Sequence, residues 1–242
     1  MNVGSIGRRI RAFTLVAAVL LVSVAGPAGV STASAQDATI TTRVIILHAG
    51  TDVGDVEVHI NNESELDNFA YGDQSDWIDI NPGSARVTIT ADRSGFNYVL
   101  FDTVYPIPAG NDFYLVISDS LILTGIFDTS AVAAQGSTVA VLHASVDTPP
   151  VSVAATGDAV TFATELGYSR TSDATGVPNG TYDVEVALAD TGDVLLTQPG
   201  VVIEPSMSYI LVFMGDPGST DKPLEIVALG TDLKEDTGTP AS

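Results

Sequence analysis

The stretch that decides the fold occurs twice in the chain, as VIILHAGTD at residues 44–52 and as VAVLHASVD at residues 139–147. Each stretch is an apolar run that ends in a histidine, and an aspartate follows four residues after each histidine. Such self-similarity is best sought before any assignment of fold, because it marks a duplicated structural unit. The sequence therefore predicts two related units of about 90 residues each, with their boundaries set by this motif.

The similarity continues beyond the opening motif in the same order. Residues 87–89 (VTI) match residues 184–186 (VEV), and residues 113–117 (FYLVI) match residues 209–213 (YILVF). Small shifts in spacing fall between these runs, where loops absorb insertions. The small, polar segment 129–137 (TSAVAAQGS) is the expected joint. The expected organisation is a signal peptide at residues 1–35, copy 1 at 40–130, copy 2 at 137–233 and a polar tail at 234–242.

Both copies carry the pattern of β-strands. Residues 84–91 alternate small or apolar side chains with polar ones, and their counterpart at 181–188 alternates in the same way. A period of two indicates a strand with one buried face, and a turn sequence precedes each strand, at 81–83 and 178–180. Turns recur every 8–12 residues or so, which is typical of a sandwich of about seven strands. We expect an all-β protein: two tandem Ig-like or transthyretin-like antiparallel β-sandwich domains after the signal peptide.

The first 35 residues have the three parts of a secretory signal peptide. Arg8, Arg9 and Arg11 precede the apolar run 12–25, and Ala33-Ser34-Ala35 forms a small-residue cleavage site before Gln36. The alternative is a membrane anchor, but the apolar run is shorter than the roughly 20 residues of a comfortable span. The arginine pair also leaves the twin-arginine export route open. We expect a secreted, extracellular or envelope-associated protein that begins near Gln36 and has no membrane span in its mature chain.

The composition excludes several classes of protein. The 242 residues contain 9 Lys and Arg against 30 Asp and Glu, for a formal net charge of -21. Phosphate neutralisation needs a basic face, so nucleic acid is not an expected partner. The absence of cysteine rules out disulfides, thiolate zinc sites and a cysteine nucleophile. The acidic surface favours solubility, or attraction of a cation or basic partner.

The motifs resemble a bacterial family known as the domain of unknown function 4397. Its members begin with a V-R-x-x-H-A-S-P-D-A-P-x-V-D-V run, which is similar to residues 43–58 and more closely to residues 142–153. A later P-A-G-x-Y-x-V-x-V element resembles residues 178–186. Copy 1 departs from the first motif, with Gly50-Thr51 in place of Ser-Pro. The resemblance implies secreted or envelope-associated β-sandwich modules and supplies no reaction, and fold alone would not supply one.

The repeated histidines are the residues that most resemble reactive groups. A histidine held by a carboxylate, as His48 by Asp52 or His143 by Asp147, could serve as a general base or as half of a metal site. The same pair could instead pin the strand to the following turn through hydrogen bonds. No Gly-x-Ser-x-Gly or His-Glu-x-x-His motif accompanies them. We therefore predict a structural role, with no catalytic, cofactor-binding or metal-ligating residue and no cofactor.

Two further features have a functional and a structural interpretation. The acidic stretch from Glu63 to Asp79 spreads its carboxylates too widely for a tight calcium loop, and a solvated strand edge is the better interpretation. Trp77, the sole tryptophan, and Tyr71 could stack on sugars if they are exposed. Aromatic side chains of a sandwich more often belong to its core.

The sequence thus predicts a non-enzymatic, monomeric secreted module with a structural, adhesive or binding role at the bacterial envelope or exterior. Its partner would be an unidentified protein or polysaccharide of the envelope. The first alternative is a carbohydrate- or cation-binding module. The second is a hydrolase that uses a His–Asp pair, and it lacks a nucleophile or metal set.

Overall fold

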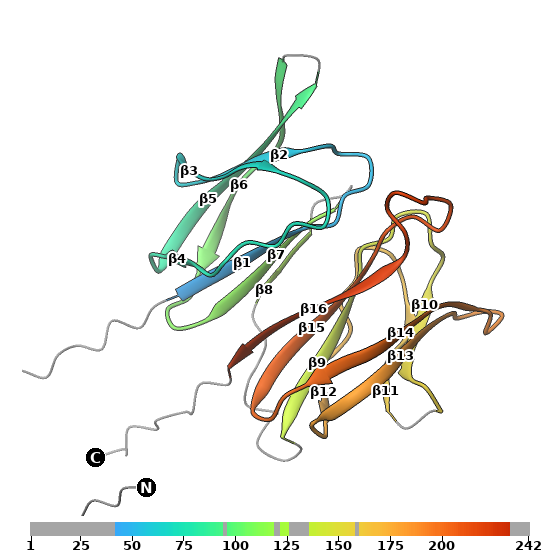
Figure 1. Cartoon of the computed structure of the whole chain (residues 1–242). Coiled ribbons are helices and arrows are strands. Elements are labelled where there is room, and N and C mark those ends of the chain that lie inside the picture. Colours follow the sequence, from blue (N-terminus) through green and yellow to red (C-terminus); the bar gives the residue numbers. More distant parts are fainter. Residues whose placement is uncertain (1–41, 94–95, 119–121, 126–135, 158–159, 233–242) are drawn as a thin grey trace, which may run out of the picture. The chain divides into compact units, whose positions relative to one another are not determined.

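The computed structural model describes residues 42–93, 96–118, 122–125, 136–157 and 160–232. The expected signal peptide, its cleavage site, most of the joint and the polar tail lie outside these residues. Every regular element that is described is a β-strand (Figure 1), so the all-β prediction is confirmed. In this part of the chain no helix has the length and apolarity needed to cross a membrane.

The strands of each copy follow one another in the same order along the chain. Copy 1 contains β1 (Thr42–His48), β2 (Val56–Ile60), β3 (Glu63–Phe69), β4 (Ile78–Ile80), β5 (Gly83–Arg93), β6 (Phe96–Ile107), β7 (Asp112–Ile117) and β8 (Ile122–Gly125). Copy 2 contains β9 (Ser137–His143), β10 (Val151–Ala155), β11 (Thr161–Leu166), β12 (Thr175–Val177), β13 (Gly180–Leu188), β14 (Val194–Ile203), β15 (Met207–Met214) and β16 (Glu225–Asp232).

Each copy builds two four-stranded sheets with identical topology. The orders are β3-β2-β5-β6 and β4-β1-β7-β8 in copy 1, and β11-β10-β13-β14 and β12-β9-β15-β16 in copy 2. The described residues thus contain eight strands per copy instead of about seven. The short strands β4 and β12, of three residues each, are too brief to show a period of two.

One strand pair in each copy departs from the expected antiparallel pattern. β1 pairs with β7 in parallel, and β9 pairs with β15 in parallel. The other pairs described are antiparallel. After β1 the chain passes through β2 and β3 of the other sheet and returns at β4, which pairs antiparallel with β1 on one side. It then crosses again through β5 and β6 before β7 pairs in parallel with β1 on the other side. Parallel neighbours need such a long crossover.

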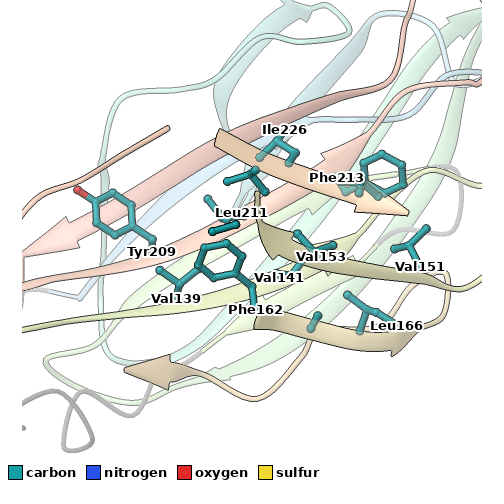
Figure 2. Packing of buried hydrophobic residues seen from close by; sticks show 14 of the residues in the cluster. Val139, Val141, Val151, Val153, Phe162, Leu166, Tyr209, Leu211, Phe213 and Ile226 are labelled. Carbon is teal, nitrogen blue, oxygen red and sulfur yellow. The ribbon is translucent and has the colours of Figure 1, made fainter. Parts of the chain in front are cut away.

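Each sandwich has its own apolar core between its sheets. In copy 2, side chains from β9, β10, β11 and β15 meet between the layers, with the Phe162 ring among them (Figure 2). In copy 1, the alternating residues Ala85, Val87, Ile89 and Ala91 of β5 are buried. The sequence alternation therefore identified the inward face of this strand correctly, because one face of its sheet is solvated.

A third apolar cluster, here called the seam, combines side chains of both copies. The described residues of the two copies accordingly belong to one compact unit. The seam consists of Ile45, Leu47, Ala49, Tyr114 and Val116 of copy 1 with Leu142, Ala144, Ile210, Val212, Met214 and Leu229 of copy 2.

Polar contacts accompany the seam. The Tyr114 hydroxyl donates to the Ser208 carbonyl oxygen at 3.5 Å, and the Thr231 hydroxyl donates to the Asp112 carboxylate. Asp112 also accepts two bonds from the Arg43 guanidinium, at 3.0 and 2.6 Å. Each copy therefore carries one sheet that is covered on both faces, by its own core and by the seam.

Candidate functional site

The turn after β1 is organised around the buried His48 side chain. His48 is fully inaccessible to solvent, and its Nε2 lies 2.7 Å from the Gly54 carbonyl oxygen. The Gly50 amide donates to Nδ1 at 3.2 Å. These partners fit one neutral tautomer, with the proton on Nε2 and the lone pair on Nδ1. Both ring nitrogens thus bond to backbone groups of the loop that leads into β2.

The His48 backbone ties a second turn to the same point. Its amide donates to the Asp73 carbonyl oxygen at 3.0 Å, and its carbonyl oxygen accepts from the Gly72 amide at 2.8 Å. Copy 2 repeats this geometry, because His143 bonds through its amide to Arg170 at 3.0 Å and through its carbonyl to Ser169 at 2.8 Å. In each copy the histidine therefore connects three segments at one end of the sandwich.

The His143 side chain repeats one of the two ring hydrogen bonds that His48 makes to its turn. It is fully buried, and its Nε2 lies 3.2 Å from the Pro149 carbonyl oxygen. The ring packs edge-on against Phe213 and Tyr168, with centroids 5.2 and 6.1 Å apart, and Nδ1 is buried without a hydrogen-bond partner. Burial lowers the pKa of His143, outweighing the backbone bonds at Pro149 and Thr148, which favour the charged form.

The aspartates of the two motifs lie at the surface. Asp52 and Asp147 are both exposed, in contrast to the buried histidines. In copy 2 the imidazole bonds to the Pro149 carbonyl and not to Asp147. The motif thus brings a histidine together with the backbone of its own turn. This geometry favours the structural interpretation over a His–Asp catalytic pair.

Other ionisable groups do not converge into a metal centre in the described part of the chain. No group of three or more His, Asp or Glu side chains there has the arrangement needed to hold a metal ion. His59 of β2 lies 3.8 Å from Glu57, and both are partly exposed. The acidic stretch runs along β3, the segment after it and β4, and all six of its carboxylate residues are exposed. Since β3 and β4 are edge strands of their sheets, the acids on them lie at solvated strand edges, as the sequence predicted. These are Glu63, Glu65, Asp67 and Asp79, whereas Asp73 and Asp76 lie between the two strands.

The two candidate ligand-contact aromatics pack against the seam. Trp77 meets the Tyr114 ring edge-on, with centroids 5.8 Å apart, and the Arg43 guanidinium carbon lies 4.7 Å from the Trp77 centroid. The Lys222 ammonium lies 5.2 Å from the Tyr71 centroid. Both aromatics are partly buried. Their rings therefore contact protein groups, an arrangement that favours packing over sugar stacking.

A pocket that the sequence did not predict lies at one end of copy 2. It has a volume of about 380 Å³ and is lined by Pro149, Pro150, Glu165, Ala189 and Asp190. These residues come from the loop before β10, the end of β11 and the turn after β13. The sequence signal was the proline pair, which copy 1 replaces with Gly54-Asp55.

Comparison with known proteins agrees with the repeated architecture. No curated protein matches the chain. A family model described as a domain of unknown function matches it twice, at residues 42–136 and 137–241. These matches confirm the tandem duplication, because they are adjacent and together cover most of the chain. The chain therefore belongs to the DUF4397 family and carries two tandem copies of its domain.

Proposed function

We propose that this protein is a non-enzymatic, exported module with a structural, adhesive or binding role in the envelope or exterior of a bacterial cell. The protein works as a monomer, because two molecules that each have a formal net charge of -21 repel one another. The observation that carries the proposal is the placement of the repeated histidines. Their ring nitrogens face backbone groups of their own turns, beneath a surface that excludes solvent.

The same observation argues against the hydrolase alternative. A general base must come within hydrogen-bond reach of the proton that it removes. His48 and His143 both have no exposed surface, so a substrate would have to displace the turns that cover them. The seam adds support for a structural module, because it joins the two sandwiches through a continuous set of apolar contacts.

The acidic pocket of copy 2 favours a cation-binding module as the second candidate function. Its carboxylates and the overall negative charge suit a cation. The pocket lining contains no aromatic ring, so it gives less support to stacking of a carbohydrate.

Export is tested by N-terminal sequencing of the protein recovered from cell fractions. We expect a chain that begins at or near Gln36, in the medium or the envelope fraction, because a small-residue cleavage site precedes this residue. An intact Met1 on a membrane-bound form would contradict export with cleavage.

The absence of enzymatic activity is tested with the purified mature chain, residues 36–242. We expect no turnover on panels of ester, glycoside and peptide substrates, and retention of the protein on isolated envelope material or on a glycan array. The His48→Gln and His143→Gln variants should keep this retention and unfold at lower temperature. Turnover that both variants lose, without any loss of stability, would overturn the proposal.

A further inference from the structure

The pocket of copy 2 is formed where three neighbouring strands begin or end. Val151, the first residue of β10, pairs with Leu166 of β11 on one side and with Leu188 of β13 on the other. The chain neighbours of these three residues line the pocket: Pro150 precedes Val151, Glu165 precedes Leu166, and Ala189 follows Leu188. Pro150 is therefore central, with Glu165 on one flank and Ala189-Asp190 on the other. The pocket thus combines an apolar centre with an acidic residue on each flank.

Hydrogen bonds hold the centre of the pocket in place. The Ala189 amide donates to the Pro150 carbonyl oxygen at 2.9 Å, and the His143 ring lies 3.2 Å from the Pro149 carbonyl oxygen. The Ser145 and Thr148 hydroxyls bond to each other at 2.6 Å below the same loop. The proline rings also have a fixed φ angle. The backbone of this loop would lose little conformational freedom on binding, and such preorganisation favours affinity.

We propose that this pocket binds an arginine side chain presented by a basic polypeptide partner. The aliphatic stem of arginine packs on apolar surface while its charged head stays near polar groups. Here Pro149, Pro150 and Ala189 supply the apolar surface. The flanking carboxylates of Glu165 and Asp190 supply acceptors for a guanidinium, which matches carboxylates through a planar fork of donors. The inference deepens the proposed binding function and rests on it.

Other ligands fit the lining less well. A hard cation such as calcium takes six to eight oxygens, and the lining offers only two carboxylates on an apolar floor. An anionic ligand would meet both carboxylates and the field of a chain with a net charge of -21. The same field would speed the approach of a basic partner.

Copy 1 provides an internal comparison for the pocket. Its residues aligned with Pro149 and Pro150 are Gly54 and Asp55, and the residue aligned with Asp190 is Arg93. Copy 1 therefore lacks both prolines of the pocket, and it has a positive residue where copy 2 has the negative Asp190. The proposed site therefore belongs to copy 2 alone.

The test is an NMR titration of the isotope-labelled mature chain, residues 36–242, with an acetylated, amidated peptide of alternating glycine and arginine. We expect saturable shifts of the Val151, Leu166 and Ala189 amides. The matched peptide with citrulline in place of arginine removes the charge and keeps the shape, and it should not produce these shifts.

Three variants locate the binding. Asp190→Arg, which copies the charge of copy 1, and Glu165→Gln should each weaken binding about tenfold, the effect of losing one charge-assisted hydrogen bond. Asp173→Arg makes the same charge change at an exposed position of copy 2 outside the pocket. This control should change the dissociation constant less than about twofold, since screening removes most of a distant surface interaction.

Each other outcome counts against the inference in a distinct way. Shifts spread over the acidic surface, with Asp173→Arg as damaging as Asp190→Arg, would show charge attraction without a site. The same pocket shifts with the citrulline peptide or with a neutral oligosaccharide would overturn the assignment of arginine. Retention on envelope material without any pocket shift would overturn this inference while leaving the proposed function intact.

Discussion

His48 and His143 show how one side chain determines the course of the chain after a strand. Each connects its own turn, a second turn about 25 residues later and the end of a central strand. In copy 1 both ring nitrogens have backbone partners, whereas in copy 2 Nδ1 has none. The two histidines should therefore differ in how much each contributes to stability, although their motifs are nearly identical.

Replacement of His143 by alanine should destabilise copy 2. The change removes the bond to the Pro149 carbonyl and the packing against Phe213, so the free energy of unfolding should fall by at least about 0.5–1.5 kcal/mol. Thermal unfolding of wild type and variant measures this loss. A parallel zinc titration provides the control. Unchanged stability, together with loss of stoichiometric zinc binding, would identify His143 as a metal ligand.

The pH dependence of stability should reveal the buried, neutral state of His143. Because its pKa in the folded state is lowered, the unfolded chain binds the proton more readily. The contribution of neutral His143 to the free energy of unfolding is complete above the ordinary histidine pKa of about 6.5. It is lost as the pH falls below that value toward the folded-state pKa.

Comparison with His143→Gln isolates this effect from the titration of the many carboxylates. Glutamine has no proton to gain in this range and can still donate to the Pro149 carbonyl. Denaturant unfolding at about pH 7.5 and about pH 5.5 should show a larger loss in wild type, by at most about 1.4 kcal/mol per pH unit. Equal losses in the two proteins would contradict a buried, neutral His143.

Strands that are covered on both faces differ in sequence pattern from strands that are covered on one face. β5 has one buried face and therefore alternates. Along β1, β7, β9 and β15, the residues facing the core alternate with residues facing the seam, and nearly all are buried. These strands consequently have continuous apolar sequences such as VIIL at 44–47, the pattern of a strand with no solvated face.

The end of β15 depends on a glycine that other residues cannot replace. Gly215 has a φ of 102°, and a Cβ built there would lie 2.2 Å from the Pro223 carbonyl oxygen. Gly215→Ala should therefore cost about 1–3 kcal/mol or more. Gly218→Ala is the matched control, because its Cβ would meet its nearest neighbour at 3.5 Å without a left-handed φ. Chemical denaturation of both variants measures the difference, and equal stabilities would contradict the predicted strain.

At the level of the whole molecule, the seam determines what happens when the copies are separated. Copy 2 has its own core, so a fragment of residues 137–235 should still unfold cooperatively. Removal of copy 1 would expose the seam side chains of copy 2, among them Leu142, Ile210 and Val212. Such an exposed apolar face promotes association. We expect the fragment to be folded and to self-associate with rising concentration, as sedimentation equilibrium would show.

The Val212→Lys variant should have opposite consequences in the two contexts. In the full chain it places a charge in the seam and should destabilise the protein by several kcal/mol. In the fragment the same lysine faces solvent and should restore a monomer with little loss of stability. An unfolded fragment would instead show that copy 2 cannot fold without the seam.

The sequence by itself determined the features that local patterns encode. The alternation at 84–91 and 181–188 identified strands and their inward faces, because a period of two reflects the geometry of a single strand. The repeated His-containing motif identified the duplication and the family resemblance, which the two adjacent family matches confirm. The wide spacing of the acids from Glu63 to Asp79 favoured a solvated strand edge, and the structure places four of the six on edge strands.

Only the tertiary structure decided which distant segments meet. The parallel pairing of β1 with β7 joins residues about 70 positions apart along the chain, and no local period reports it. The seam likewise places Tyr71 and Trp77 against other side chains of the protein, and for Tyr71 these include Lys222 of the other copy. The pocket arises from three strand ends that meet only in the folded sheet. Each of these features depends on contacts between remote residues, and a sequence pattern records the side chains without recording which of them become neighbours.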